Sequence, residues 1–255
     1  MSSFANPADA ALRSLSPSQL AFLEALPKAE LHAHLNGSIP LPFLEQLARE
    51  YTQSPPTTSS ASPLAAEVLA RVRRLQTHEG LDNIYDFFEL FPAIYALTST
   101  PANLKRATRA ILSHFLDPDP DAGAGRGTVA YIELRTTPRE TAHMTRQAYL
   151  ETVLDEIEAR PPDVAALIVC LDRAMTLQVA REVIDLAVQL RRDGRRVVGV
   201  DLCGDPRVRF VHISLAQSHL SFIGGRHGDV RRAFPLGAHR GAWRYATHRR
   251  GTHII

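Results

Sequence analysis

Between residues 129 and 202 the chain alternates short apolar runs with longer amphipathic segments, and this alternation restricts the fold more than any other feature. The runs Val129–Leu134, Val164–Leu171 and Val197–Leu202 have the length and apolar content of buried strands. The segments Thr145–Ala159 and Thr176–Arg191 repeat apolar residues at helical spacing. Strands that alternate with helices of this length form parallel β/α units, so the sequence predicts an α/β protein.

A fourth strand is predicted upstream, in Leu31-His32-Ala33-His34-Leu35. Alternate side chains of a strand point to the same face, so His32 and His34 can share one metal ion. A catalytic zinc takes roughly three protein ligands and keeps one position open for water. Paired strand histidines also occur without metal, so the pair alone leaves both readings open.

Helices are predicted before and between these strands. Ser16 is placed as an N-cap before Pro17, with Gln19 completing a capping box. The Ser/Thr/Pro-rich stretch 52–63 is expected to be a flexible surface insertion. Further helical segments are predicted at Pro42–Glu50, Leu64–Leu75, Leu81–Tyr95 and Ala102–Leu116.

Polar residues follow the ends of all four predicted strands. A (β/α)₈ barrel builds its active site at the carboxyl ends of its strands. Four strands cannot close such a barrel, so we expect about the first four β/α units of a TIM barrel. The residues at these ends are His32 and His34, Arg135–Arg139, Asp172 with Arg173, and Asp201–Asp205.

The bulk composition is that of an ordinary globular protein. No apolar run approaches the roughly 20 residues of a membrane span, and the N-terminus lacks a signal-peptide pattern. Cys170 and Cys203 both lie in apolar runs, so we interpret them as buried free thiols. Two unpaired thiols suit a reducing compartment, and a cytoplasmic protein without membrane partners is expected.

Three runs, in this order, carry a resemblance to a known family: LPKAELHAHLNGSIP from Leu26, YIELRTTPR from Tyr131 and VVGVDLCGDP from Val197. They resemble the adenosine deaminase-like branch of the metal-dependent deaminases, and most closely its N6-methyl-AMP deaminase group. The resemblance covers about residues 16–206. It implies a TIM barrel in which one Zn²⁺ activates a water molecule to attack carbon six of a purine, and a protein that is monomeric when complete.

The resemblance also implies roles for individual residues. His32 and His34 correspond to the first two zinc ligands, with His34 also near the substrate. Asn36 corresponds to a substrate contact at which adenosine deaminases proper more often have Asp, and this favours the methyl-AMP group. Tyr95 departs from the family, whose members can carry His there, and this leaves its contact in doubt.

The segment Thr136-Thr137-Pro138-Arg139 corresponds to one that holds the substrate, and its hydroxyls and guanidinium suit a 5′-phosphate. Asp172 and Gly204 correspond to further substrate contacts. Each residue has a structural alternative. Arg139 can be a solvated loop charge, Asp172 a helix N-cap, and Gly204 the residue that permits a tight turn.

The stretch 207–255 differs from the rest of the chain. It carries nine Arg and one Asp (+8), whereas residues 1–206 carry 20 basic and 26 acidic residues (−6). The family's third zinc-binding His and its proton-donating Glu are not recognisable there, and no Glu follows Glu182. We therefore assign no catalytic residue, and expect residues 1–206 to be the N-terminal half of a deaminase barrel. A basic extension that binds nucleic acid is a disfavoured alternative, because the arginines are scattered among apolar residues.

The genetic code offers an explanation for this stretch. The codons from Trp243 to Gly251, read one base later, permit Gly-Val-Thr-Leu-His-Ile-Ala-Glu, which resembles the missing family motif. Codons for Val208 and for Ile223-Gly224 can hold the GT and AG ends of an intron. We therefore expect an aberrant basic tail, made of a retained intron and an out-of-frame exon, on a truncated and inactive chain.

The sequence thus predicts a zinc-dependent hydrolytic deaminase of a 6-aminopurine nucleotide, converting N6-methyl-AMP to IMP and methylamine. Adenosine deaminase proper is one alternative. A non-enzymatic protein that binds nucleotides through the same loops is another.

Overall fold

The computed structural model describes residues 7–53, 67–68, 70–74, 84–118 and 129–205. All of them belong to the first of two units, Met1–Gly225. The second unit, Arg226–Ile255, lies outside the described residues, as do the predicted basic tail and the insertion beyond Gln53.

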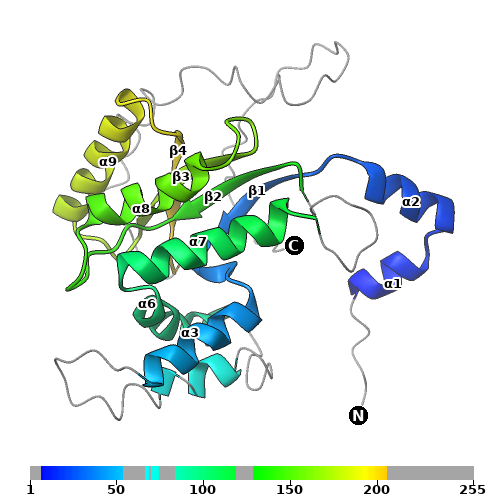
Figure 1. Cartoon of the computed structure of the whole chain (residues 1–255), viewed down its shortest axis with the longest axis horizontal. Helices are drawn as coiled ribbons and strands as arrows, with labels where there is room; N and C mark the ends of the chain where they lie inside the picture. Colours follow the sequence, from blue (N-terminus) through cyan, green and yellow to red (C-terminus); the bar gives the residue numbers. More distant parts are fainter. Residues whose placement is uncertain (1–6, 54–66, 69, 75–83, 119–128, 206–255) are drawn as a thin grey trace. The chain divides into compact units, whose positions relative to one another are not determined.

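Four strands form one parallel sheet in the order β1-β2-β3-β4 (Figure 1). They are β1 (Ala29–His34), β2 (Tyr131–Thr136), β3 (Ala165–Asp172) and β4 (Val197–Cys203). Each strand pairs with the next along the chain, as the βαβ pattern predicts. The four predicted strands are confirmed, and the sheet with its alternating helices is part of an α/β barrel.

The polar side chains near the carboxyl ends of the strands point mainly to one face of the sheet. In the register of the ladder, His34 pairs with Arg135, and Arg135 pairs with Ile168. Cys170 pairs with Asp201 on β4. Paired residues of parallel strands point to the same face, so these polar residues share one face while Leu134, Leu167 and Val169 lie on the other.

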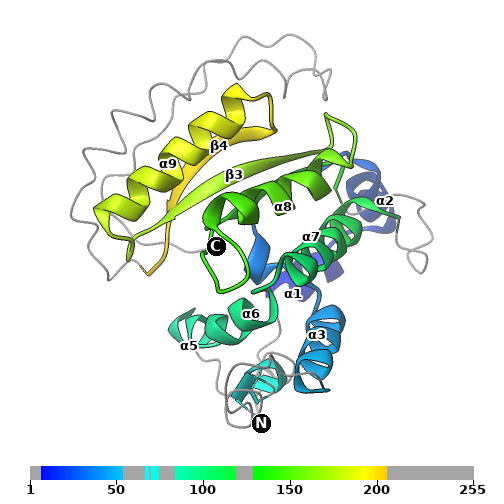
Figure 2. The same ribbon diagram turned by 60° about the vertical axis from the view of Figure 1, so that its left-hand side comes forward.

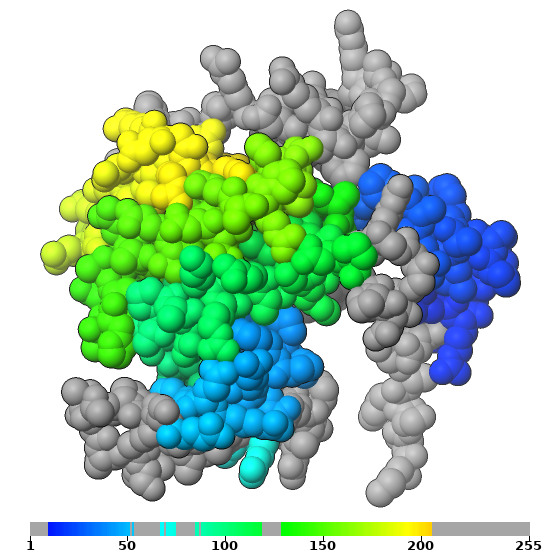
Figure 3. All heavy atoms as spheres, viewed as in Figure 1, coloured from blue at the N-terminus to red at the C-terminus, as the bar shows by residue number. Residues whose placement is uncertain are grey.

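Three helices cover the apolar face of the sheet (Figures 1 and 2). Each begins after a Thr N-cap whose hydroxyl accepts a backbone N–H at the third helical residue. Their buried apolar stripes form one core with the strands, and their outer surfaces are contiguous in Figure 3. These helices are α7 (Pro101–Leu116), α8 (Arg146–Glu158) and α9 (Leu177–Arg192).

The Ser16 prediction is confirmed, because its hydroxyl and the Gln19 side chain form a reciprocal capping box before α2. The single helix predicted over Leu81–Tyr95 is wrong in one respect: it is broken at Glu89–Leu90. Pro92 has no N–H to donate to the preceding turn, so it cannot continue that helix. It lies instead in the first turn of a new helix, where no such hydrogen bond is needed. The remaining described elements are α1 (Pro7–Arg13), α2 (Pro17–Ala25), the 3₁₀ helix η1 (Leu35–Gly37), α3 (Leu41–Gln53), α5 (Ile84–Phe88) and α6 (Phe91–Leu97).

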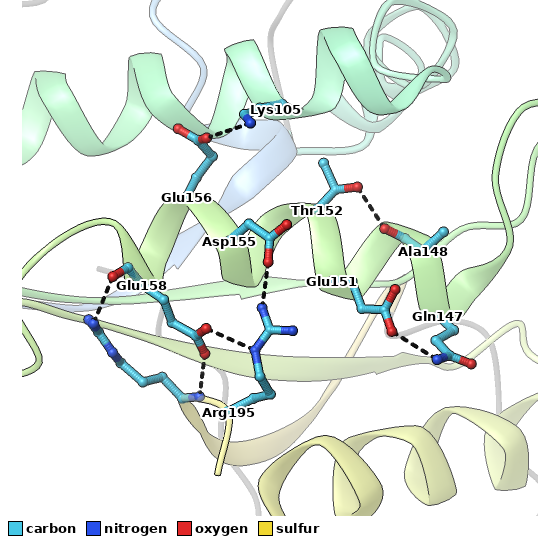
Figure 4. A network of polar contacts seen from close by, with 10 residues as sticks. Lys105, Gln147, Ala148, Glu151, Thr152, Asp155, Glu156, Glu158 and Arg195 are labelled. Carbon is cyan, nitrogen blue, oxygen red and sulfur yellow. Dashed lines mark hydrogen bonds and ion pairs between the residues drawn. The ribbon is translucent and has the colours of Figure 1, made fainter. Parts of the chain in front are cut away.

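Ion pairs on α8 tie this helix to its neighbours (Figure 4). Glu156, 7% exposed, accepts from Arg109 of α7 at 2.8 Å and lies 3.6 Å from Lys105. Arg195, just before β4, pairs with Asp155 at 2.7 Å and with Glu158 at 2.8 Å. These ion pairs join α8 to α7 and to the residues before β4, and so they orient the helix.

Candidate active site

The histidine pair lies at the carboxyl end of β1. The ring centroids of His32 and His34 are 5.3 Å apart, so both imidazoles project to one face as predicted. His32 is exposed and His34 is half-buried. Burial lowers the pKa of His34, and the positive charges of His32 and Arg135 lower it further. The neutral imidazole, which has a free lone pair for a metal, is therefore favoured at His34.

Arg135 connects three strands beside His34. Its guanidinium, on β2, donates to the Asp201 carboxylate on β4 and to the Leu31 carbonyl on β1, the latter at 2.6 Å. Arg135 is 8% exposed, and its Nε is buried without a hydrogen-bond partner among the described residues. The interior face of the sheet thus has one buried cation, neutralised by Asp201, directly against the histidine pair.

Thr136 and Thr137 point to opposite faces of the sheet. The Thr136 hydroxyl is buried on the helical side, 2.8 Å from the phenol oxygen of Tyr149. The Thr137 hydroxyl lies on the interior face, 3.2 Å from the Cys203 sulfur. Thr137 is therefore placed for a side-chain contact with a ligand. The predicted substrate contact of Thr136 stays a prediction. Because the side chain points to the helical side, only the backbone of Thr136 could make this contact.

Hydrogen bonds to buried residues fix the side chain of Asn36. Its side-chain amide donates to the Thr98 hydroxyl at 3.3 Å, and its oxygen accepts from Tyr149 at 3.5 Å. Tyr149 is fully buried, and burial raises its pKa to about 12. This buried network fixes the Asn36 amide, which is 8% exposed.

Arg139 lies on the ring of Tyr95, with 3.3 Å between the guanidinium carbon and the ring centroid. Pro138, just before it, is buried and restricts the backbone. Burial raises the pKa of Tyr95, and the Arg139 charge opposes this rise. The Arg139 Nε is buried and has no hydrogen-bond partner among the described residues. Tyr95 therefore holds the guanidinium in place by a cation–π contact and leaves donors free for an anion.

Asp172 and Gly204 meet where β3 and β4 end. Asp172 Oδ1 accepts the Ala174 N–H at 2.8 Å, whereas the N-cap of α9 is Thr176. The alternative role of Asp172 as that N-cap is thus excluded. Gly204 has φ +96°, and a Cβ there would lie 2.7 Å from Asp172 Oδ1. The glycine permits both the turn and the close approach of the carboxylate.

The sequence located some residues of this region and missed others. Asp201 and Cys203 fall in the predicted strand-end stretch Asp201–Asp205, and the structure shows that they alternate along β4 on the interior face. Tyr149 and Thr98 contact Asn36 across long sequence separations, and no local pattern marks them.

Two observations bound what the described residues can hold. Among residues 7–53, 67–68, 70–74, 84–118 and 129–205, no group of three or more His, Cys, Asp or Glu side chains could hold a metal ion. Within this part of the chain, the histidine pair brings together two imidazole nitrogen donors without a third His, Cys, Asp or Glu. A groove along the outer side of α9, lined by residues such as Leu177, Arg181 and Asp185, contains none of the predicted site residues.

The strand-end cluster and the parallel β/α units define a barrel-type protein whose candidate site lies at the carboxyl edge of the sheet. The family described as adenosine deaminase matches residues 27–242, and the chain belongs to this family. The match extends into the stretch expected to be unrelated to it. Within the described part of the chain, no helix is long and apolar enough to cross a membrane.

The chain is also similar to curated proteins named as deaminases or deaminase-like proteins. An adenosine deaminase-like protein of Drosophila pseudoobscura is 34% identical over 190 residues, which are 72% of this chain and 51% of the relative. Human N6-methyl-AMP deaminase is 32% identical over 201 residues, 75% of this chain and 50% of the relative. The chain spans about half the length of these curated relatives.

Solved structures agree with the fold. The Arabidopsis protein ADAL in complex with GMP is 28% identical with a TM-score of 0.62, covering 80% of this chain and 56% of that one. Its complex with IMP gives the same identity and TM-score over 79% of this chain.

Proposed function

We propose that this chain supplies the nucleotide-binding face and the first two metal ligands of a hydrolytic deaminase acting on N6-methyl-AMP, giving IMP and methylamine. The observation that carries the proposal is the gathering of the His32/His34 pair, Thr137, Arg139 and Asp172 at one edge of the sheet. The names of the relatives support it, and so do the complexes of the Arabidopsis protein with GMP and IMP.

The state of Arg139 favours a nucleotide over a nucleoside. Its guanidinium is fixed on Tyr95 and its Nε is buried without a partner among the described residues. A 5′-phosphate would provide the acceptor oxygens that this group lacks, in the bidentate geometry that arginine prefers. Adenosine has no phosphate and would leave the Arg139 guanidinium without a counter-charge. This argues against adenosine deaminase proper.

His32 and His34 fit one zinc ion as two imidazole ligands, because both are on one face and the pKa of His34 is lowered. When bound, zinc would lower the pKa of a water molecule toward neutrality and so supply hydroxide. Arg135 and Asp201 form an ion pair beside His34, so the positive charge of Arg135 is balanced there. Asn36, held by Thr98 and Tyr149, would present its amide to the purine.

A charge-matched pair of variants tests the phosphate assignment. In calorimetric titrations of the full chain with IMP and inosine, Arg139→Met should weaken IMP binding by about tenfold or more and leave inosine binding within about twofold. Arg181→Met removes one positive charge from the exposed side of α9 and should change neither. Equal losses for IMP and inosine would refute the role of Arg139.

A second candidate is a nucleotide-binding protein without turnover, which is favoured by the absence of a three-donor metal cluster among the described residues. Zinc content and methylamine release from N6-methyl-AMP separate the two. About one zinc per chain with turnover supports the deaminase, and its loss in His32→Ala assigns the ligand. IMP binding without turnover supports the second candidate. Adenosine, tested in parallel, separates the two deaminase groups.

A further inference from the structure

The two cysteines of the chain lie together on the interior face of the sheet. Cys170 on β3 pairs with Asp201 in the ladder, and Asp172 pairs with Cys203 on β4. The cysteines are therefore diagonal neighbours on adjacent strands. Cys170 is fully buried, and Cys203 is partly accessible. The Thr137 hydroxyl lies 3.2 Å from the Cys203 sulfur.

The two thiols have different chemical characters. The neighbouring Cys170 thiol lowers the pKa of Cys203, burial opposes this, and the hydroxyl of Thr137 lowers the pKa again. The neighbouring Cys203 thiol raises the pKa of Cys170, and burial raises it further. Cys203 is thus the sulfur that becomes a thiolate, and thiolates are the nucleophilic form. Cys170 is the protonated neighbour within reach.

We propose that Cys203 and Cys170 form an oxidation-sensitive dithiol in the wall of the nucleotide site, with Cys203 as the attacking thiol and Cys170 as the resolving thiol. The oxidant is a hydroperoxide. The Cys203 sulfur attacks its terminal oxygen, the O–O bond breaks, and an alcohol or water leaves with a sulfenic acid on Cys203. The Cys170 sulfur then displaces that oxygen, which takes the Cys170 proton and leaves as water. Two thiols and one hydroperoxide give a disulfide, the alcohol or water, and a further water.

The disulfide would change the site. Diagonal neighbours lie about 7–8 Å apart, beyond the separation that a disulfide bridges without backbone movement. Closing the bond would draw the ends of β3 and β4 together, directly at the Asp172–Gly204 contact. It would also remove the sulfur partner of Thr137. This consequence for nucleotide binding rests on the proposed function, whereas the dithiol chemistry does not.

The test uses the reduced full chain, which has two cysteines only, so a free-thiol count reports on this pair alone. Equimolar hydrogen peroxide should remove both thiols together, and non-reducing peptide mass spectrometry should find the peptides of Cys170 and Cys203 linked, two hydrogens lighter. Dithiothreitol should restore both thiols. In Cys170→Ala the reaction should stop at a sulfenic acid on Cys203. In Cys203→Ser the loss of the Cys170 thiol should be at least about tenfold slower.

Thr137→Val keeps the side-chain shape and removes the hydroxyl, so it should slow the first step severalfold without blocking it. Independent oxidation of the two cysteines, or accumulation of Cys203 sulfenic acid in the unsubstituted chain, would overturn the proposal. The effect of oxidation on nucleotide binding is tested separately. Saturating IMP should slow the oxidation, and the oxidised chain should bind IMP about tenfold more weakly. If the reduced chain does not bind IMP at all, the proposed function fails while the linked peptides still establish the dithiol.

Discussion

Replacement of Gly204 by alanine should destabilise the chain and weaken nucleotide binding together. A residue with a Cβ at φ +96° carries a backbone penalty of about 1–2 kcal/mol. The added Cβ would also lie 2.7 Å from Asp172 Oδ1 and 3.2 Å from the Arg173 nitrogen. The carboxylate would have to move and give up its 2.8 Å bond to Ala174, at a further cost of about 1.5–3 kcal/mol. We expect Gly204→Ala to lose about 2.5–5 kcal/mol.

Gly194 provides a matched control. It has φ +81°, and a Cβ built there meets nothing within 4 Å. Gly194→Ala should therefore show the backbone penalty alone, about 1–2 kcal/mol, with IMP affinity unchanged. Urea unfolding measures the stability of both variants, and calorimetry at a temperature where both are folded measures their affinity. If the two variants lose the same stability and both keep IMP affinity, the contact between Gly204 and Asp172 does not matter and the reasoning is refuted.

Three further predictions follow from other parts of the structure. Tyr149→Phe leaves the buried Thr136 hydroxyl without its 2.8 Å partner and should lower the free energy of unfolding by about 1–2 kcal/mol in denaturant titrations; no measurable loss would contradict the network. A hydrogen bond from Arg106 lowers the pKa of Glu50 from 4.5 to about 2, so the pair stabilises the fold above about pH 4.5 and loses this effect as the pH falls toward 2. Because both side chains are more than a third exposed, Glu50→Gln should cost less than about 1 kcal/mol at pH 7 and less still at pH 3, and a larger cost at pH 3 would reverse the sign. Finally, spliced mRNA from the source organism should lack the codons of Val208–Ile223, and transcripts that all retain this interval would refute the intron hypothesis.

The sheet and its covering helices could be predicted from the sequence because their signals are local. Buried parallel strands are apolar throughout, and α7, α8 and α9 each have a threonine N-cap and an apolar stripe. The break before α6 was missed because helical periodicity continues through Pro92, and the backbone consequence of that proline outweighed it.

The candidate site could be predicted only in part. Strand ends and the family motifs located His32, His34, Arg139 and Asp172 at one edge. The contacts that orient them come from elsewhere in the chain, such as Tyr95 beneath Arg139. Such long-range contacts depend on how the units pack, which periodicity does not encode.

The order of the strands has a consequence for how the sheet assembles. The chain between β1 and β2 is roughly three times longer than the chain between β2 and β3. Closing this longer loop costs about 1 kcal/mol more entropy. Pairing of β2, β3 and β4 should therefore come first, with β1 and its two histidines joining a sheet that already exists. In native-state hydrogen exchange, amides of β1 would then open at lower free energy than those of β3.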